Sequence, residues 1–186
     1  MQLSNKIMND MKQANKDEIR QRYLAVDTSN VADILDTLGY LDQGLSSDFA
    51  PLPVRRDGTK LAGWAYTIRG QTPFPLGGDD DKMQACRGLS AGEISVWSGD
   101  GKGICYFGEL IARGMKERGC VGAVLDGGIR DVRWIGQHGF PVFAKYRTPG
   151  PVHRSLESKR LASSPCLAWR DIQFCVGQAG RLHSWR

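Results

Sequence analysis

Two adjacent charged residues in the second half of the chain, Arg130 and Asp131, have side chains suited to binding a small organic acid. The guanidinium of arginine is a planar fork that matches a carboxylate, and its charge does not titrate away at neutral pH. The carboxylate of aspartate offers the hard oxygen ligands that Mg²⁺ and Mn²⁺ prefer, and these cations leave coordination positions for a substrate. The pair therefore predicts a site for a 2-oxo acid beside a divalent cation.

A second motif, Gly108-Glu109-Leu110-Ile111, opens a predicted helix. The first backbone N–H groups of a helix have no partner inside it, and they lie at the positive end of the helix dipole. The N–H groups of Leu110 and Ile111 are therefore suited to hold a carboxylate or the oxygen of a developing enolate. If both motifs face one cavity, together they can stabilise an enolate.

Each of these residues also has a purely structural explanation. Asp131 suits the cap of the helix that follows it, and Glu109 complements the dipole of its own helix. Arg130 has two carboxylates close by in the sequence, Asp126 and Asp131, with which it can pair on the surface. Acidic residues favour helix starts for reasons unrelated to function, so spacing alone leaves both explanations open.

The elements that carry the two motifs alternate along the chain between apolar runs and helical spacing. Strands are predicted at 94–97, 120–125 and 141–144, with one helix at 108–118 and another that the turn at 126–131 opens and Gly139 ends. This order implies parallel strands joined by right-handed crossovers, which is the α/β class. Such sheets bind ligands beyond the carboxyl ends of their strands, where both motifs lie.

The N-terminal part is predicted to be mainly helical. Residues 1–25 carry apolar positions at loosely helical spacing and indicate one or two surface helices. The clearest helix covers residues 31–38, with capping side chains at 28–30 and Gly39 positioned to end it. Aromatic and β-branched residues then predict a strand at 61–69.

Composition narrows the classes of protein to which the chain can belong. A length of 186 residues with 41% hydrophobic and 24% charged content indicates one globular domain. No stretch approaches the roughly 18 uninterrupted apolar residues of a membrane helix, and residues 1–20 are too polar for a signal peptide. We therefore expect a cytoplasmic protein with no membrane segment.

The net charge of +5 belongs to the end of the chain. Residues 145–186 hold eight Lys and Arg against two acids, or +6, which leaves 17 minus 18, or −1, for residues 1–144. Because no aromatic residues alternate with the basic ones on a common face, nucleic acid is not the expected partner. The five cysteines form no CxxC pair, so inert thiols are expected rather than a zinc site.

A longer series of motifs resembles a known family. The run GELIARGMKERGCVGAVLDGGIRDVRWIGQHGFPVFA follows VADILDTLG and a GDD loop. Over roughly residues 25 to 152, this series resembles the family of 4-hydroxy-4-methyl-2-oxoglutarate (HMG) aldolases and RraA regulators of ribonuclease E. The resemblance implies a single α/β domain of the swivelling β/β/α kind, with N-terminal helices at about residues 1–40. It also implies homotrimers or hexamers with sites between subunits.

The resemblance further implies a class II, metal-dependent pyruvate aldolase with oxaloacetate decarboxylase activity. Asp131 would anchor the divalent cation, Mg²⁺ or Mn²⁺, partly through water. Arg130 would act in catalysis and bind the carboxylate and keto region of the substrate. Cleavage of the C3–C4 bond would leave a pyruvate enolate that water then protonates.

The remaining roles that the resemblance implies fall on residues 108–111. The backbone at Gly108, Leu110 and Ile111 would bind the pyruvyl group of the substrate. Glu109 would be the second catalytic residue and would orient a water molecule on the metal side.

Two departures from the family pattern matter. Aldolases of the family resemble R-D-x-x-[DE], whereas the last position is Trp134 in this chain. Residues 153–186 form a basic, serine-rich tail that does not resemble the family, so we predict a domain over residues 1–152 followed by this tail. The leading hypothesis is a lyase, and the alternative is a non-catalytic RraA-type regulator that binds and inhibits ribonuclease E. A third hypothesis is a family member that has lost its activity because its tail is altered.

Overall fold

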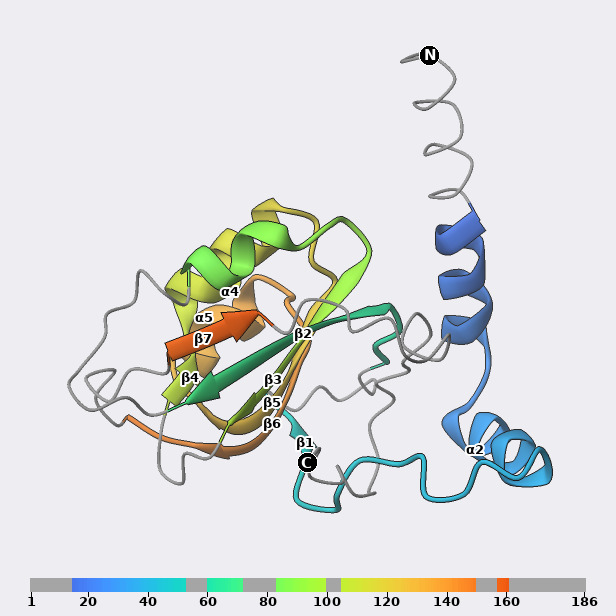
Figure 1. Ribbon diagram of the computed structural model, residues 1–186. Coiled ribbons are helices and arrows are strands. Elements are labelled where there is room, and N and C mark those ends of the chain that lie inside the picture. Colours follow the sequence, from blue (N-terminus) through green and yellow to red (C-terminus); the bar gives the residue numbers. More distant parts are fainter. Residues whose placement is uncertain (1–14, 53–59, 72–82, 100–104, 150–156, 161–186) are drawn as a thin grey trace, which may run out of the picture.

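A seven-stranded sheet forms the centre of the computed structural model, which describes residues 15–52, 60–71, 83–99, 105–149 and 157–160 (Figure 1). The strand order is β1-β6-β5-β3-β2-β7, and β4 pairs with β5 beside this path. The strands are β1 (Ala50–Pro51), β2 (Trp64–Gln71), β3 (Glu93–Gly99), β4 (Cys105–Phe107), β5 (Gly122–Ile129), β6 (Val142–Arg147) and β7 (Glu157–Arg160).

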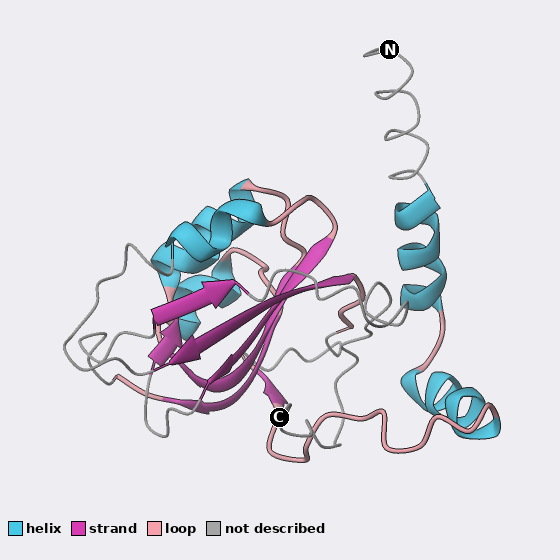
Figure 2. Ribbon diagram, viewed as in Figure 1, coloured by secondary structure: helices cyan, strands magenta, loops and turns pink. Residues whose placement is uncertain are grey.

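The strands in the middle of the sheet are parallel. The pairs β2–β3, β3–β5, β4–β5 and β5–β6 are parallel, whereas the edge pairs β1–β6 and β2–β7 are antiparallel. Helices α4 (Glu109–Glu117) and α5 (Val132–Gln137) connect the central strands and lie on the same side of the sheet (Figure 2). The α/β class predicted from the sequence is confirmed.

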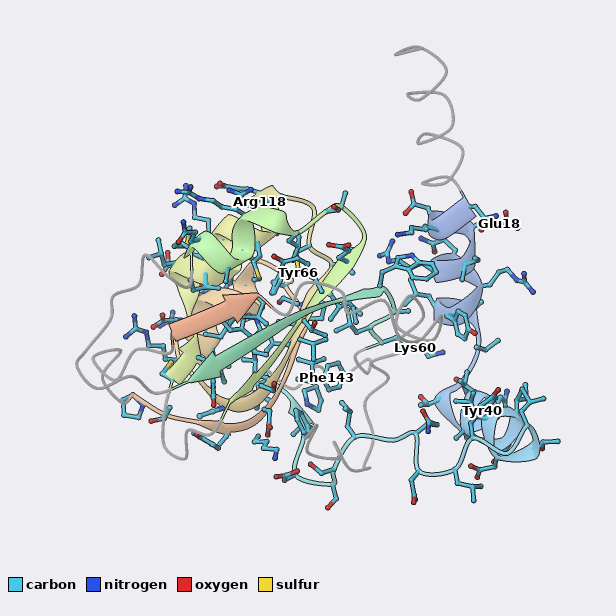
Figure 3. All side chains as sticks on the ribbon, in the orientation of Figure 1. Glu18, Tyr40, Lys60, Tyr66, Arg118 and Phe143 are labelled. Atoms are coloured by element: carbon cyan, nitrogen blue, oxygen red, sulfur yellow. The ribbon has the colours of Figure 1, made fainter. Side chains whose placement is uncertain are left out.

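The sheet separates two apolar clusters. Alternating side chains of a strand point to opposite faces, so Leu125 belongs to the cluster under α4 and α5, and Val124 belongs to the other cluster. Tyr66 lies on the helix side, where its hydroxyl donates to the carbonyl oxygen of Ala85 at 2.6 Å. Phe143 lies on the opposite side (Figure 3). The strands that lead to the candidate site are therefore buried on both faces.

The prediction of a turn that begins at Asp126 is wrong. Asp126-Gly127-Gly128 was predicted to leave the sheet, yet β5 continues through these residues to Ile129, with an irregular register against β6. Gly127 lies directly against the buried ring of Tyr106, where a Cβ atom would be 1.7 Å from a ring carbon. The glycine therefore serves close packing within a strand, and β4, which carries Tyr106, was not predicted.

The N-terminal helices differ in how they meet the sheet. The helix of residues 15–25 is held by Arg20, whose Nε donates to the Ala62 carbonyl at 3.0 Å, and by Lys16, whose Nζ lies 4.9 Å from the centre of the Trp64 ring. Helix α2 (Thr28–Thr37) has no buried residue and stands away from the sheet (Figure 1). No helix within the described ranges is long and apolar enough to cross a membrane.

The predicted caps of α2 are partly wrong. Residues 28–30, expected to cap the helix, lie inside its first turn, and Asp27 takes the N-cap position without a side-chain cap bond. Gly39 follows the helix with φ of 84°, a conformation that favours glycine, as predicted. At the other end of the chain, β7 pairs with β2, and the domain boundary after residue 152 stays a prediction. The remaining tail residues lie outside the described part of the chain.

Candidate functional site

The two motifs singled out in the sequence meet at the carboxyl ends of β4 and β5. The backbone N–H of Glu109 donates to Oδ2 of Asp131 at 3.0 Å. The backbone N–H of Arg130 donates to the carbonyl oxygen of Phe107 at 3.0 Å, which extends the pairing of the two strands. The first amide of α4 is therefore bound to the side chain that precedes α5.

Asp131 has both a structural partner and a charged neighbour. Its Oδ2 lies 3.4 Å from Nε of Arg130, and the two side chains are 39% and 37% exposed. Its backbone has φ of 55°, in the left-handed region that non-glycine residues seldom adopt. Asp131 makes no side-chain cap bond to its own helix α5, so it caps the neighbouring helix α4 instead.

Of the two carboxylates near Arg130 in the sequence, Asp126 and Asp131, only one pairs with it among the described residues. Arg130 pairs with Asp131. The other candidate, Asp126, accepts a hydrogen bond from Nζ of Lys145 at 2.7 Å, and the same Nζ lies 3.3 Å from a carboxylate oxygen of Asp48. Asp126 therefore belongs to a separate ion-pair network on β5 and β6.

Gly108 leaves room for the charged pair. A Cβ atom at this position would lie 2.6 Å from Oδ2 of Asp131 and 3.0 Å from both Cγ and Nε of Arg130. These distances are shorter than van der Waals contact, so any larger residue at 108 has to displace the two side chains. The geometry gives Gly108 a spatial reason to be glycine, while its assignment to substrate binding stays a prediction.

The amides of Leu110 and Ile111 lie in the first turn of α4. Among the described residues, neither amide has a hydrogen-bond partner, as expected for the start of a helix. The side chain of Leu110 is 57% exposed, whereas that of Ile111 is buried in the core and fixes the turn. Glu109 is half-buried beside Asp131. The six predicted site residues therefore lie at one corner, and their roles in binding and catalysis remain predictions.

An open depression of about 510 Å³ lies beside this corner. Arg130 and Asp131 line this depression. Residues 108–111 do not line it, but the Glu109 amide is bound to the side chain of Asp131. The lining also contains Arg147, which the sequence did not suggest, because the last strand was expected to end at Ala144. The full lining is Ile129, Arg130, Asp131, Val132, Arg147, Thr148 and Pro149.

Trp134 occupies the position where the family pattern has an acid. Its ring stacks on His138 at a centroid distance of 3.9 Å and packs against the core cluster under α5. Nδ1 of His138 lies 2.8 Å from the carbonyl oxygen of Trp134. Position 134 therefore contributes packing to α5 in this chain rather than a carboxylate.

The donor set around Asp131 fits a hydrated divalent cation. Within the described ranges, no group of three or more His, Cys, Asp or Glu side chains could hold a metal. Among the described residues, both contacts of Asp131 use Oδ2, so Oδ1 is the oxygen that could bind a ligand. Mg²⁺ keeps several waters and is often bound through one or two carboxylates, so a single exposed carboxylate suits it.

Among the described cysteines, Cys86 and Cys120 are not candidates for nucleophilic chemistry at this site. The thiols of Cys86, Cys105 and Cys120 are buried. Burial raises the pKa of the Cys86 thiol to about 12, and burial also raises the pKa of the Cys120 thiol. Since the thiolate is the reactive form, these two thiols stay protonated and inert at neutral pH.

Comparison with known proteins identifies the family. The pattern of the RraA-like family (Aldolase/RraA) matches residues 28–162, which is most of the chain. The chain belongs to the RraA-like family, as its motifs predict. No curated protein sequence matches the chain.

Several solved structures share the fold. A crystal structure described as novel cellulases from microbes of the gut ecosystem has a TM-score of 0.70 at 22% identity, covering 88% of this chain and 71% of that chain. RraAS2 of Streptomyces coelicolor, described as an unusual member of the RNase ES inhibitor RraA family, has a TM-score of 0.60 at 23% identity, with coverages of 75% and 67%. The RNA-processing inhibitor RraA from Thermus thermophilis has a TM-score of 0.59 at 18% identity, with coverages of 83% and 90%. At these identities the likeness establishes the fold alone.

Proposed function

We propose that this chain is a divalent-metal-dependent lyase that cleaves HMG or a related 2-oxo acid to pyruvate and also decarboxylates oxaloacetate. The observation that carries the proposal is the shared oxygen of Asp131, which lies 3.0 Å from the Glu109 amide and 3.4 Å from Nε of Arg130. Because of this contact, a carboxylate and a guanidinium line one depression, and the same carboxylate is bound to the first turn of α4.

Asp131 is the residue that would hold the cation, Mg²⁺ or Mn²⁺, through its free oxygen. When bound, such a cation acts as a Lewis acid on the 2-oxo group of the substrate. Arg130 lines the depression and contacts Asp131 through Nε, and its guanidinium binds the carboxylate next to that group.

Cleavage breaks the C3–C4 bond of the substrate and leaves its electron pair on the pyruvyl part as an enolate. In HMG the C4 hydroxyl gives its proton to a water molecule and becomes the keto group of the second pyruvate, whereas in oxaloacetate the lost fragment is CO₂. The amides of Leu110 and Ile111, at the positive end of α4, stabilise the negative charge that develops on the enolate oxygen. Glu109 orients the water that returns a proton to C3.

The test follows pyruvate formation from oxaloacetate and from HMG with and without Mg²⁺. Asp131→Asn keeps an acceptor oxygen for the Glu109 amide but removes the charge, and Arg130→Gln removes the guanidinium. Each is expected to lower the rate by about 100-fold or more, as removal of one charge-stabilising group does elsewhere. Arg133→Gln, an exposed arginine on α5 outside the depression, is the matched control and keeps the wild-type rate. Metal-replete wild-type protein that forms no pyruvate would refute the lyase.

A second candidate function is that of a non-catalytic regulator of ribonuclease E. Trp134, packed on His138 in place of an acid, favours it, because a lyase would use a carboxylate there to support the site. Two of the similar structures bear names of RNA-processing inhibitors. In this case the purified protein would inhibit RNA cleavage by ribonuclease E. The Asp131→Asn variant would inhibit this cleavage as strongly as the wild-type protein.

We further propose that the chain assembles as a homotrimer or hexamer. The apolar side chains of Ile34, Leu38 and Leu41 are exposed around α2, and burial against another subunit would remove them from water. Light scattering coupled to size-exclusion chromatography measures the mass in solution. A strictly monomeric protein at micromolar concentration would contradict this assembly.

A further inference from the structure

The depression beside Arg130 contains a second arginine that the proposed function does not use. Arg147 is the last residue of β6, and its register partner on β5 is Ile129, the residue before Arg130. The backbone N–H of Thr148 donates to the Ile129 carbonyl at 3.0 Å, so the two strands stay side by side up to the site. Both arginines line the depression.

The charges that line this depression are unbalanced. Asp131 is its one acidic residue among the described lining, and this carboxylate already pairs with Arg130. Arg147 is exposed and forms no ion pair within the part of the chain that the structure describes. A concave surface with two guanidiniums and one carboxylate attracts a ligand that carries more than one negative charge.

Lys145, the other cation of β6, differs from Arg147 in its contacts. Lys145 lies two positions before Arg147, but its Nζ contacts the carboxylates of Asp126 and Asp48 and does not line the depression. Lys145 therefore has a structural role within the fold. Arg147 has no such partner among the described residues, and its planar guanidinium is well matched to a carboxylate of a ligand.

We infer that Arg147 is a specificity-determining residue that binds the second carboxylate of a dicarboxylic 2-oxo acid. The inference rests on the proposed function, in which Arg130 binds the carboxylate next to the keto group. Arg147 ends β6 and Arg130 directly follows β5, and neighbouring strands lie about 5 Å apart, so the two guanidiniums can reach the two ends of a short dicarboxylate. Arg147 would contact the carboxylate on the C4 side of the bond that breaks, so its contribution to affinity is measured with acids that lack a C4 hydroxyl and are not cleaved.

The inference predicts a preference between two ligands that differ only at the far end. 2-Oxoglutarate and 2-oxopentanoate have the same five-carbon chain, with a carboxylate in the first where the second has a methyl group. Calorimetry with Mg²⁺ is expected to show that wild-type protein binds 2-oxoglutarate about tenfold more tightly, the effect of one partly exposed charge-assisted contact. Arg147→Gln is expected to abolish this preference without changing the affinity for 2-oxopentanoate.

Two further variants serve as controls. Arg147→Lys keeps the charge but loses the fork, so part of the preference should remain. Arg133→Gln removes an exposed arginine of α5 outside the depression, and the full preference should remain. The inference is overturned if Arg147→Gln keeps the preference, or if it weakens the binding of both acids equally.

Pyruvate formation from oxaloacetate by the same preparations separates this inference from the proposed function. If wild-type protein forms pyruvate but the preference does not depend on Arg147, the inference alone fails. If no pyruvate forms while Arg147→Gln still abolishes the preference, the lyase fails and the dicarboxylate-binding role of Arg147 stands.

Discussion

Helices α2 and α4 have nearly the same length and opposite relations to the rest of the fold. α4 has nine residues and buries Ile111, Ala112 and Met115 in the main core, whereas α2 has ten residues and buries none. Both carry apolar residues at helical spacing, so this pattern predicts a helix but not whether its apolar face is covered within the chain. The candidate site begins on the covered helix, and the core therefore fixes its position.

The largest difference between the two helices should follow from truncating a buried side chain of α4. Met115 is fully buried, so Met115→Ala is expected to lower the free energy of unfolding by about 2–5 kcal/mol. Urea denaturation followed by circular dichroism measures this change. Met115→Leu conserves volume and should cost less than about 1.5 kcal/mol. Equal losses for the two variants would contradict tight packing under α4.

Ion pairs give the next largest contrast. Lys145→Met leaves the half-buried carboxylate of Asp126 without its partner and should cost about 1–3 kcal/mol. Its matched control is Lys60→Met, since Lys60 pairs at 3.1 Å with Asp27, next to α2, and both side chains are exposed. The control should cost less than about 1 kcal/mol. Equal effects in urea denaturation would show that burial does not distinguish the two pairs.

The contribution of Lys145 should also depend on pH. Burial opposes the charge of Lys145, but the hydrogen bond and charge of Asp126 outweigh burial and raise the pKa of Lys145. The contribution of Lys145 to the free energy of unfolding is therefore complete below pH 10.5 and is lost as pH rises through the higher folded pKa. Hydrogen bonding by Ser46, and then by Lys145, lowers the pKa of Asp48. Its contribution is complete above pH 3.8 and is lost as pH falls through the lower folded value. The difference between wild type and Lys145→Met, measured by urea denaturation across pH, should therefore be largest between these limits.

Gly108→Ala is expected to affect activity more than stability. The added methyl group would meet Oδ2 of Asp131 and both Cγ and Nε of Arg130, and displacing these side chains should cost about 1–3 kcal/mol. Their displacement should lower the rate of pyruvate formation, while thermal unfolding shows that the variant remains folded. An active Gly108→Ala variant would mean that the close contact at this corner has no part in catalysis.

The smallest effect is expected on α2. Ile34 is 60% exposed, so Ile34→Ala should change the free energy of unfolding of an isolated subunit by less than about 0.5 kcal/mol. Chemical denaturation at low and high protein concentration measures it. A larger loss that grows with protein concentration would mean that another subunit covers this face.

Much of the fold could be predicted because its signals are local. The apolar runs of β3, β5 and β6, the helices α4 and α5, and the glycines that follow these helices all lie within short windows of sequence. The continuation of β5 through Gly127 could not be predicted, because it depends on the Tyr106 ring, which approaches from another strand. A glycine pair indicates a turn when only the sequence is known, and only tertiary contact distinguishes close packing from chain reversal.

The candidate site shows the same division. Arg130, Asp131 and the start of α4 could be proposed from residue types at the ends of predicted elements. Arg147 could not, because its place beside Arg130 follows from the register of β6 against β5 and from the length of β6. The alternation of polar and apolar residues after Ala144 was the one available signal that the strand continues.

At position 131 the backbone conformation favours glycine, whereas the contacts of the side chain require a carboxylate. A φ of 55° in a residue with a side chain costs on the order of 1 kcal/mol, and glycine would adopt it freely. A glycine at 131 would relax the chain and delete the carboxylate at the same time. Backbone stability therefore favours glycine at this position, whereas the hydrogen bond to the Glu109 amide together with the ion pair to Arg130 requires the acid.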